Sequence, residues 1–458
     1  MFAARVLFGF LLACSGALGA APDDATLMAL LKERVDDRRW ATGVVLGITA
    51  PTGNRLLSYG TFGIDDARPV GGDTVFEVAS LTKIFTALLL ADMAERGKLK
   101  IDAPVTTCLH DVMLPSRHGK QITFLDLATH SSGLPLRPTN LASQTGANKY
   151  AAYTTTQMFQ GLSTYTLERD IGSSFEYSNW GYGLLGHALA RCADTSYAAL
   201  LQQRITGPLR MSDTQIALSA QMKSRMATGH NEQFEPVGPQ YMGALVGAAG
   251  LFSTANDLLV LIESFVGRKQ TALAPAMSRM LTPRRAGDDP STQMGLGWRI
   301  TTDQDEQIVW SNGRSDGSRA FMGFNPRTRI GVVALANAAT NAGADDIGRH
   351  VLDPRQQPLR RHPRIELSAS LLERYLGDYR FEDGAKLRIV RDGDLMVSQW
   401  RSKQDEDQGA SLIHPESERV FNLDDVEARL VFELPVEGKA NAVTLEQNGL
   451  SFKAERVK

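Results

Sequence analysis

The chain has 458 residues, a formal net charge of −2 at pH 7, 43% hydrophobic residues and 22% charged residues. This length allows two domains, one of them large, and the composition is ordinary for a globular protein. The nearly neutral charge gives no reason to expect a nucleic-acid partner. The histidines are scattered and there is no Cys-x-x-Cys or His-Glu-x-x-His motif, so we expect neither a catalytic metal nor another cofactor.

Residues 1–20 have the pattern of an export signal. Arg5 precedes an apolar run at residues 6–13, and small residues follow at 17–20. The run is too short to span a bilayer as a mature helix. We expect cleavage near residue 20 and a periplasmic or secreted protein. Lipid attachment at Cys14 is the alternative, and it is the only route by which we expect membrane attachment.

Cys108 and Cys192 are the other two cysteines of the chain. In an oxidising compartment they could form a disulfide. Two buried free thiols are the favoured interpretation, because nothing in the sequence brings the two positions together.

The N-terminal part of the chain predicts a helix, a hairpin and a second helix. Residues 24–39 predict an amphipathic helix, and strands are predicted at 43–49 and 55–62, joined by a turn at 50–54. A mostly apolar helix then begins at or beside Ser80 and ends at Gly97.

Lys83 is an unusual residue for the first turn of that helix. Its charge would lie at the positive end of the helix dipole, and apolar surroundings would favour the neutral amine. Ser80, one turn earlier on the same face, would then have a base within reach, and backbone N–H groups at the helix start could stabilise developing negative charge. Ser-x-x-Lys alone is a weak pattern, for which a capping serine and a solvent-reaching lysine are the common explanation. The position of Lys83 favours the catalytic interpretation here.

Residues 102–289 predict a mainly helical region with long polar loops, including a short helix at 123–129. Within this region, Tyr177 and Asn179 follow a loop and precede another helix, a place where polar groups are presented rigidly. Tyr177 could relay protons if a nearby ammonium lowers its pKa, and Asn179 can both donate and accept hydrogen bonds. Packing by the tyrosine and capping by the asparagine are the alternative roles.

Four strands are predicted next, followed by a helix at 345–352; the strands lie at 297–302, 307–310, 320–325 and 329–336. The second strand leads into Ser311, Asn312, Gly313 and Arg314. A strand edge beside a nucleophile can offer a backbone N–H as a second oxyanion donor and can pair with an extended substrate. An ordinary strand end is the alternative interpretation.

Residues 313–317 also match Gly-x-Ser-x-Gly, the nucleophile elbow of α/β-hydrolases. Asp345 and His350 follow in the order that such a triad needs. The motif requires a helix directly after it, whereas a strand is predicted at 320–325. This hypothesis is therefore disfavoured.

The order of elements favours an α+β fold, in which an antiparallel sheet is assembled from both ends of the first domain and flanked by helices beside an all-helical region. Residues 353–364 are rich in proline and arginine and predict a linker, with a solvated linker favoured over a docking patch. A small all-β barrel or sandwich follows, with hairpin turns at 392–393 and 448–449. The predicted division is a signal peptide at 1–20, a first domain at 21–352, the linker and a β domain at 365–458.

Three short motifs in this order carry a family resemblance. Ser80-Leu81-Thr82-Lys83, Tyr177-Ser178-Asn179 and Ser311-Asn312-Gly313 resemble the motifs of penicillin-recognising serine hydrolases, with class C β-lactamases and related penicillin-binding proteins and esterases the most similar group. The stretches 127–135, 321–326 and 333–337 support it. The resemblance covers about residues 24–352 and implies a β-lactamase/DD-peptidase-like fold. The C-terminal β domain is similar to the lipocalin-like extension of some members.

The resemblance also implies roles for single residues. Ser80 would attack a carbonyl carbon while Lys83 and Tyr177 share its proton as general base and acid. Backbone N–H groups of Ser80 and Arg314 would hold the oxyanion, and Asn179 would orient Lys83 and a substrate amide. Water would then hydrolyse the acyl-enzyme.

The third motif departs from the family pattern at its first position. That position is usually Lys or His, which helps to hold a substrate carboxylate, and here it is Ser311. Its neutral side chain removes a charge-assisted contact, although Arg314 could supply the charge instead. The neutral Ser311 therefore weakens the expectation of β-lactam turnover and strengthens that of esterase-like activity.

We therefore expect an exported serine hydrolase that acts through an acyl-serine on β-lactams or D-alanyl peptides. A carboxylesterase with the same residues is the alternative among enzymes. A non-catalytic penicillin-binding or sensor protein, whose β domain contacts a partner, is the alternative from another class. In each case the ligand is a small molecule or a peptide.

Overall fold

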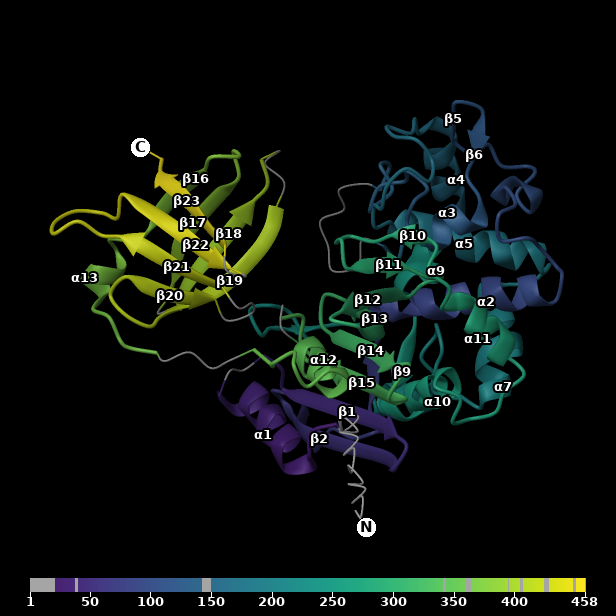
Figure 1. Cartoon of the computed structure of the whole chain (residues 1–458), viewed down its shortest axis with the longest axis horizontal. Coiled ribbons are helices and arrows are strands. Elements are labelled where there is room, and N and C mark those ends of the chain that lie inside the picture. The colour runs from purple at the N-terminus through teal and green to yellow at the C-terminus, as the bar shows by residue number, and fades with distance from the viewer. Residues whose placement is uncertain are drawn as a thin grey trace, which may run out of the picture.

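The computed structural model describes residues 21–37, 40–141, 150–340, 343–359, 364–393, 395–403, 407–423, 428–447 and 450–457. These residues form a large α+β domain and a small closed β-barrel, which Figure 1 shows as two bodies. The predicted fold class is confirmed. Across these ranges we find no helix with the length and apolar character that a membrane crossing needs.

The large domain is built on a nine-stranded antiparallel sheet with the order β10-β11-β12-β13-β14-β15-β1-β2-β3. Its β15–β1 pair joins the two ends of the domain, because Gly47 lies opposite Val333. The predicted sheet assembled from both ends is therefore confirmed. The strands are β1 (Gly43–Ala50), β2 (Gly53–Gly63), β3 (Asp66–Pro69), β10 (Arg285–Ala286), β11 (Thr292–Met294), β12 (Arg299–Asp303), β13 (Glu306–Arg314), β14 (Arg319–Asn325) and β15 (Ile330–Ala336).

Helices cover both faces of this sheet, so that β1 and β15 are buried throughout. Helices α1 (Asp24–Lys32) and α12 (Asp345–Leu352) pack on one face, and α10 (Ala255–Phe265) packs on the other. Alternate residues of β1 accordingly enter different cores. Val44 packs in the core that contains α1 and α12, and Val45 in the core that contains α10. The helix predicted over 24–39 is α1, which continues as a π-helical turn, Glu33–Asp37.

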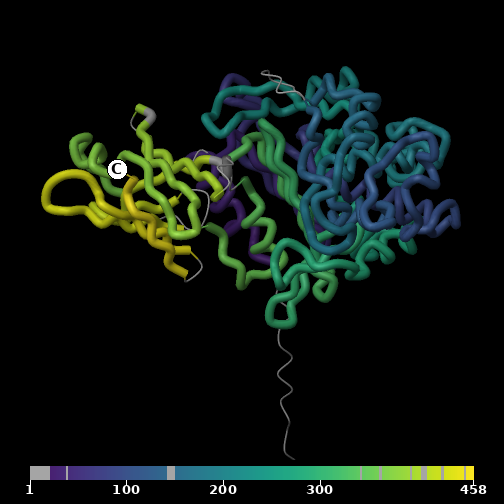
Figure 2. The backbone as a smooth tube through the Cα atoms, turned by 90° about the horizontal axis from the view of Figure 1, so that it is seen from above, coloured from purple at the N-terminus to yellow at the C-terminus, as the bar shows by residue number. Residues whose placement is uncertain are grey.

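The helical region is organised around α2 (Thr82–Glu95), which contacts α5, α9 and α11 and is buried along almost its whole length. Figure 2 shows this region, in blue and teal, beside the green strands of the sheet. Its other helices are α3 (Phe124–Ala128), α4 (Thr155–Thr164), α5 (Asn179–Cys192), α6 (Tyr197–Leu201), α7 (Gly207–Leu209), α8 (Ala220–Ser224), α9 (Val246–Ala249) and α11 (Ala274–Met280). Three two-stranded pairs complete the region: β4 (Val75–Glu77) with β9 (Phe252–Thr254), β5 (Ser116–Arg117) with β6 (Lys120–Gln121), and β7 (Gly229–His230) with β8 (Pro236–Val237).

Cys108 and Cys192 form a disulfide, with their Cα atoms 5.1 Å apart. The favoured interpretation of two free thiols was wrong. Cys192 is the last residue of α5, and Cys108 follows the 3-10 turn Val105–Thr107. Tertiary packing of the helical region brings these two ends together, which is information that the sequence spacing does not contain.

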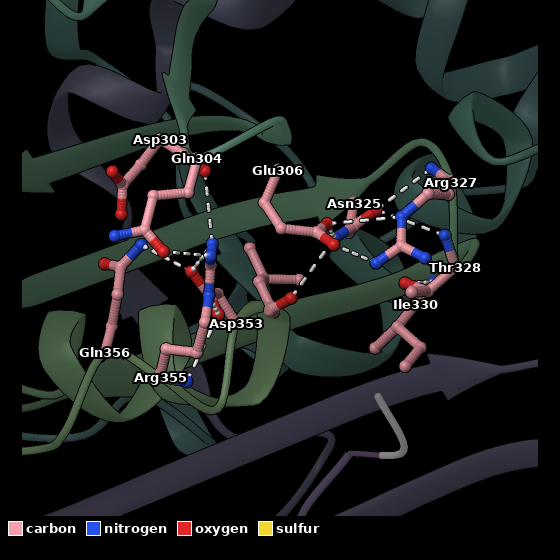
Figure 3. A network of polar contacts seen from close by, with 11 residues as sticks. Asp303, Gln304, Glu306, Asn325, Arg327, Thr328, Ile330, Asp353, Arg355 and Gln356 are labelled. Carbon is pink, nitrogen blue, oxygen red and sulfur yellow. Dashed lines mark hydrogen bonds and ion pairs between the residues drawn. The ribbon is translucent and has the colours of Figure 1, made fainter. Parts of the chain in front are cut away.

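The first half of the linker is attached to the large domain. Arg355 pairs with Asp353 and donates to the side chain of Gln304 and the carbonyl of Asp303, in the turn between β12 and β13 (Figure 3). The backbone N–H of Leu359 donates to Asp346 on α12, at 2.7 Å. This half of the linker is therefore attached to the large domain, while the Arg355 side chain stays exposed to solvent, as predicted. Residues 360–363 lie outside the described ranges.

The C-terminal domain is a closed barrel of eight antiparallel strands, in which β16 also pairs with β23. The sequence predicted either a small barrel or a sandwich, and the domain is a barrel. Its interior is filled by large side chains, including Tyr375, Tyr379, Phe421 and Phe432. The hairpin predicted at 392–393 is confirmed, because Asp392 lies opposite Leu395, and the one predicted at 448–449 falls outside the described residues. The domain comprises α13 (Ala369–Leu372) and strands β16 (Gly377–Phe381), β17 (Lys386–Asp392), β18 (Leu395–Arg401), β19 (Asp407–Pro415), β20 (Val420–Leu423), β21 (Ala428–Glu433), β22 (Ala442–Gln447) and β23 (Leu450–Arg456).

Candidate active site

Ser80 lies in a 3-10 turn, Ala79–Leu81, that leads directly into α2. The prediction of a helix that starts at or beside Ser80 is thus correct. Ala79 has a φ of 43°, in the left-handed region that a residue with a Cβ atom rarely adopts. The turn is held by hydrogen bonds from Val78 N–H to the carbonyl of Leu251 and from Leu81 N–H to the carbonyl of Val78. Backbone strain of this kind persists where surrounding structure enforces it, which is common at reactive residues.

The side chains of Lys83 and Tyr177 converge on Ser80. The Nζ atom of Lys83 lies 3.0 Å from Oγ of Ser80, and the phenolic oxygen of Tyr177 lies 2.8 Å from the same atom. Asn179 accepts a hydrogen bond from Lys83 at Oδ1, at 2.8 Å. Ser80, Tyr177 and Asn179 remain partly exposed, so that a ligand can reach them. Lys83 is covered by its neighbours, with 3% of its surface exposed.

The surroundings of Lys83 are polar but contain no bonded counter-ion. Besides Ser80 and Asn179, its ammonium donates to the carbonyl of Ala248, at 2.9 Å. No carboxylate in the described ranges forms an ion pair with it. Burial lowers the pKa of Lys83, assisted by the positive charge of Arg299 and opposed by Tyr177. The neutral amine, which can act as a base, is therefore more accessible than for an exposed lysine.

The same charges act on Tyr177. Burial alone would raise the pKa of its hydroxyl, but the charge of Lys83 and hydrogen bonds with Lys83 and Ser80 outweigh that effect, and the pKa lies below the usual value. The Lys83 ammonium lies 4.7 Å from the centre of the Tyr177 ring. Each of Lys83 and Tyr177 can therefore lose its proton more readily than an exposed residue of its type, and whichever is deprotonated can take a proton from Ser80.

The segment that carries Tyr177 is fixed by the start of α5. Ser178 is the N-cap residue, and its Oγ accepts from Gly181 N–H at 2.8 Å and donates to the carbonyl of Pro135 at 2.8 Å. On the other side, the backbone N–H of Ser178 donates to Nδ1 of His130, at 3.0 Å. The His130 ring stacks on that of Tyr177, with centroids 4.4 Å apart. The contacts of Ser178 fix the backbone beside Tyr177, and the stacked His130 ring fixes the phenol ring itself.

The third motif lies against the nucleophile turn. β12 pairs with β13 only as far as Trp310, and beyond it the described part of β13 pairs with β14 alone. The turn that contains Ser80 lies against this part of β13. A Cβ atom on Gly313 would lie 2.4 Å from the carbonyl oxygen of Val78 and 2.9 Å from the backbone nitrogen of Ser80. Only glycine permits this close approach, which brings the backbone of residues 313 and 314 beside Ser80.

A family model described as Beta-lactamase matches residues 27–354, well over half of the chain. The chain belongs to the beta-lactamase family. This confirms the resemblance inferred from the three motifs. Homologues in this family, a D-alanyl-D-alanine carboxypeptidase and a class C beta-lactamase among them, are serine hydrolases.

Two curated relatives of this beta-lactamase family chain cover most of its large domain. The D-alanyl-D-alanine-carboxypeptidase/endopeptidase AmpH of Escherichia coli (strain K12) is 28% identical over 310 residues, which are 64% of this chain and 79% of AmpH. Protein flp of Staphylococcus aureus (strain MRSA252) is 27% identical over 285 residues, which are 61% of this chain and 56% of flp.

Two solved structures resemble this beta-lactamase family chain. A class C beta lactamase from Rhodobacter sphaeroides superposes with a TM-score of 0.62 at 25% identity, covering 72% of this chain and 99% of that one. An octameric penicillin-binding protein homologue from Pyrococcus abyssi superposes with a TM-score of 0.65 at 20% identity, covering 94% of this chain and 100% of that one. The second likeness concerns the fold alone and extends into the C-terminal barrel.

Not every residue predicted for the site points into it. Ser311 and Gly313 are on the side of β13 that faces α2, but the Asn312 side chain donates to Asp345 of α12, at 2.8 Å. The Arg314 side chain is exposed and pairs with Glu232. The charge of Arg314 is thus already paired, and the oxyanion role of its backbone N–H stays a prediction.

The nucleophile-elbow hypothesis was wrong. Residues 315–318 form a turn between β13 and β14, with Ser315 N–H donating to the carbonyl of Ser318, so that a strand follows the motif instead of a helix. His350 contacts the carbonyl of Gln356 through Nδ1, and Asp345 contacts Asn312. Ser315, Asp345 and His350 therefore make no triad.

Two site residues were missed in the sequence. Burial, with the charges of Lys83 and Arg299, holds the pKa of His130 well below its usual value, so the ring is neutral and carries its proton on Nε2. Arg299, at the start of β12, lies 5.8 Å from the centre of the Tyr177 ring. The stretch 127–135 was noted only as support for the resemblance, without a role for His130, and nothing in the sequence singled out Arg299.

The described residues contain no group of three or more His, Cys, Asp or Glu side chains placed to hold a metal ion. The site contains the partly exposed hydroxyl of Ser80 and the neighbouring strand β13. Lys83 and Tyr177 lie within hydrogen-bond distance of that hydroxyl and can accept its proton. This arrangement can carry out nucleophilic attack on a carbonyl group with general acid–base assistance.

Proposed function

We propose that this chain is an exported serine hydrolase that acts through an acyl-serine at Ser80, with β-lactams or D-alanyl peptides as substrates. The observation that carries the proposal is the convergence of Lys83 and Tyr177 on Oγ of Ser80, at 3.0 and 2.8 Å. The names of AmpH and of the class C enzyme from Rhodobacter sphaeroides support the substrate class.

In the acylation step, Oγ of Ser80 attacks the carbonyl carbon of the amide. Its proton passes to the deprotonated member of the Lys83–Tyr177 pair, whose pKa values are both lowered. The oxyanion that forms is held by the backbone N–H groups of Ser80 and Arg314. The pair then returns the proton to the leaving nitrogen, and the C–N bond breaks.

In the deacylation step, a water molecule attacks the acyl-serine. The same pair takes the proton of the water and returns it to Oγ of Ser80, so that the enzyme is regenerated. Asn179 keeps Oδ1 on Lys83, which leaves its amide nitrogen to donate to a carbonyl of the substrate.

A hydrolysis panel tests this proposal. The full chain is assayed on a chromogenic cephalosporin, a D-Ala-D-Ala peptide and a nitrophenyl ester, beside Ser80→Ala and Ser163→Ala. Ser163 is an exposed serine on α4 and serves as the matched control. We expect turnover of the cephalosporin or the peptide, lost in Ser80→Ala and kept in Ser163→Ala. Equal activity of Ser80→Ala and the unaltered chain, or no turnover of any substrate, would refute the proposal.

A carboxylesterase is the second candidate, and the neutral Ser311 favours it. Ser311 is buried, with 5% of its surface exposed, and provides no cation for a substrate carboxylate. If this is the function, the unaltered chain hydrolyses only the ester in the panel. Ser311→Lys would then raise the turnover of cephalosporin or peptide relative to the ester. A binding or sensor role without turnover would instead show as a biological effect that survives Ser80→Ala.

Export is also part of the proposal. The Cys108–Cys192 disulfide supports it, because structural disulfides persist mainly in oxidising compartments. Fractionation of cells that express the full chain tests it, with Cys14→Ser as a second variant. We expect processed protein in the periplasm or medium. Retention of both forms in the cytoplasm would contradict export, and membrane association lost in Cys14→Ser would indicate lipid attachment.

A further inference from the structure

Arg299 is a cation close to Tyr177 that the acyl-transfer scheme above does not use. It is the first residue of β12 and lies opposite Trp310 of β13, near the point where the pairing of these strands ends. Its guanidinium carbon lies 5.8 Å from the ring centre of Tyr177, 6.0 Å from that of Phe175 and 5.1 Å from that of Trp310. An arginine that faces three aromatic rings has little freedom to turn away.

A carboxylate fixes the other side of this guanidinium. Nη2 of Arg299 lies 3.0 Å from Oδ2 of Asp288, and the Arg299 side chain is only 14% exposed. Water therefore screens its charge less than that of a surface arginine. The ion pair with Asp288 keeps the head group in one place, beside the aromatic rings.

The charged and titratable groups around Tyr177 come from four elements. Lys83 comes from α2, His130 from the loop after α3, Tyr182 from α5 and Arg299 from β12. His130 is neutral, and burial raises the pKa of Tyr182 far above its usual value, so that this phenol stays protonated. Lys83 and Arg299 are thus the two positive charges of this set. When the Lys83 amine is neutral, Arg299 is the remaining positive charge of this set.

We propose that Arg299 is a positioning residue of this site, which stabilises the phenolate of Tyr177 and so sets the pH at which Ser80 becomes reactive. The inference rests on the acyl-serine function proposed above. It follows from geometry and charge: a fixed guanidinium beside a phenol favours loss of the phenol proton, and it does so without touching the substrate or Ser80. The charge that Ser311 lacks thus comes from the neighbouring strand.

Three variants of the full chain test this proposal: Arg299→Gln, which removes the charge, Arg299→Lys, which keeps it, and Arg388→Gln as the matched control. Arg388 also pairs with an aspartate, Asp378, but lies in the barrel. The readout is the second-order rate constant for acylation of Ser80 by a fluorescent penicillin and by p-nitrophenyl butyrate, measured from pH 5 to pH 10. Melting curves report the folding of each variant.

We expect Arg299→Gln to shift the acid limb of the pH profile upward by about one unit, which is a loss of about tenfold at a pH on that limb and little loss above it. Arg299→Lys should keep the acid limb near its original position, and Arg388→Gln should not change it. A folded Arg299→Gln variant whose acid limb stays in place would overturn the inference, even if its activity falls at every pH. That pattern is the one a purely structural role would give.

A further variant decides the matter if Arg299→Gln does not fold. Asp288→Asn removes the counter-ion and leaves Arg299 among its aromatic neighbours, so the acid limb should move to lower pH. An unchanged or raised acid limb in Asp288→Asn would contradict the proposal. If the unaltered chain reacts with neither reagent, the proposed function fails and the inference fails with it. If the unaltered chain reacts but the variants show no shift, only the inference fails.

Discussion

The hydroxyl of Tyr177 lies 2.8 Å from Oγ of Ser80, although 97 residues separate them in the chain. This contact joins the start of α5 to the start of α2. Lys83 approaches the same oxygen from within α2, at 3.0 Å. Deprotonation of either neighbour converts it from a donor to an acceptor for the Ser80 proton, so that two groups of lowered pKa serve one nucleophile.

Tyr177→Phe removes the phenolic oxygen and keeps the ring that stacks on His130. We expect acylation of Ser80 to slow by about 10²–10⁴-fold, the usual contribution of a positioned acid–base group, while the melting temperature changes little. The rate of labelling by a fluorescent penicillin and a melting curve measure the two effects. Labelling at the unaltered rate would show that Lys83 alone takes the proton.

Gly313→Ala tests the contact between β13 and the nucleophile turn. The new methyl group would lie 2.4 Å from the carbonyl oxygen of Val78, so the strand must move away from Ser80. We expect acylation to fall by at least about tenfold through displacement of the Arg314 N–H, and stability to fall by about 1–3 kcal/mol. Gly238→Ala is the matched control, because its Cβ would have no heavy atom within 4 Å. Equal effects of the two substitutions would argue against the assigned oxyanion hole.

Glu77 predicts a pH dependence of stability. Burial raises its pKa to about 7, while hydrogen bonds from Ser315 and from Gln240 N–H oppose the shift. The folded state therefore binds more protons than the unfolded state between about pH 4.5 and pH 7, and stability falls as the pH rises through this window.

Glu77→Gln replaces the titrating carboxyl group with a neutral amide, and so removes the loss of stability that deprotonation of Glu77 causes at high pH. We expect it to stabilise the protein by up to about 3 kcal/mol at pH 8 and by much less at pH 5. Melting curves at the two pH values measure this, with the exposed Glu373→Gln as control. A gain of the same size at both pH values would contradict the protonation of Glu77 in the folded protein.

The Cys108–Cys192 disulfide closes a loop with a sequence separation of 84. Replacing both cysteines by serine should lower stability by about 2–4 kcal/mol. A reductant should lower the melting temperature of the unaltered chain to that of the double variant and leave the variant unchanged. Alkylation of both cysteines without prior reduction, seen by peptide mass mapping, would show that the bond is absent.

The parts of the site that sequence analysis could predict are those that depend on local spacing. Ser80 and Lys83 share a helix face because they are three residues apart, and Tyr177 and Asn179 are placed by a helix start that Ser178 caps. The hydrophobic periodicity was similarly sufficient for most strands of the sheet and for α12, whose bounds agree with the prediction.

The remaining features depend on contacts between segments that are distant in sequence. Arg299 lies near Tyr177 because the start of β12 meets a loop 122 residues earlier in the chain, and the two cysteines meet because α5 packs near residue 108. The short strands β4, β9, β10 and β11 have two or three residues each, which is too few for a periodic pattern. The Arg355 contacts that attach the linker likewise depend on the distant turn at 303–304.

The central claim is that Ser80 is a nucleophile activated by Lys83 and Tyr177. Intact-mass analysis of the full chain after incubation with benzylpenicillin tests it most directly, with peptide mapping to locate the adduct. The account predicts one added penicilloyl group, on Ser80, that is absent from Ser80→Ala and strongly reduced in Lys83→Gln. An adduct on another residue, or equal labelling of Lys83→Gln and the unaltered chain, would contradict it.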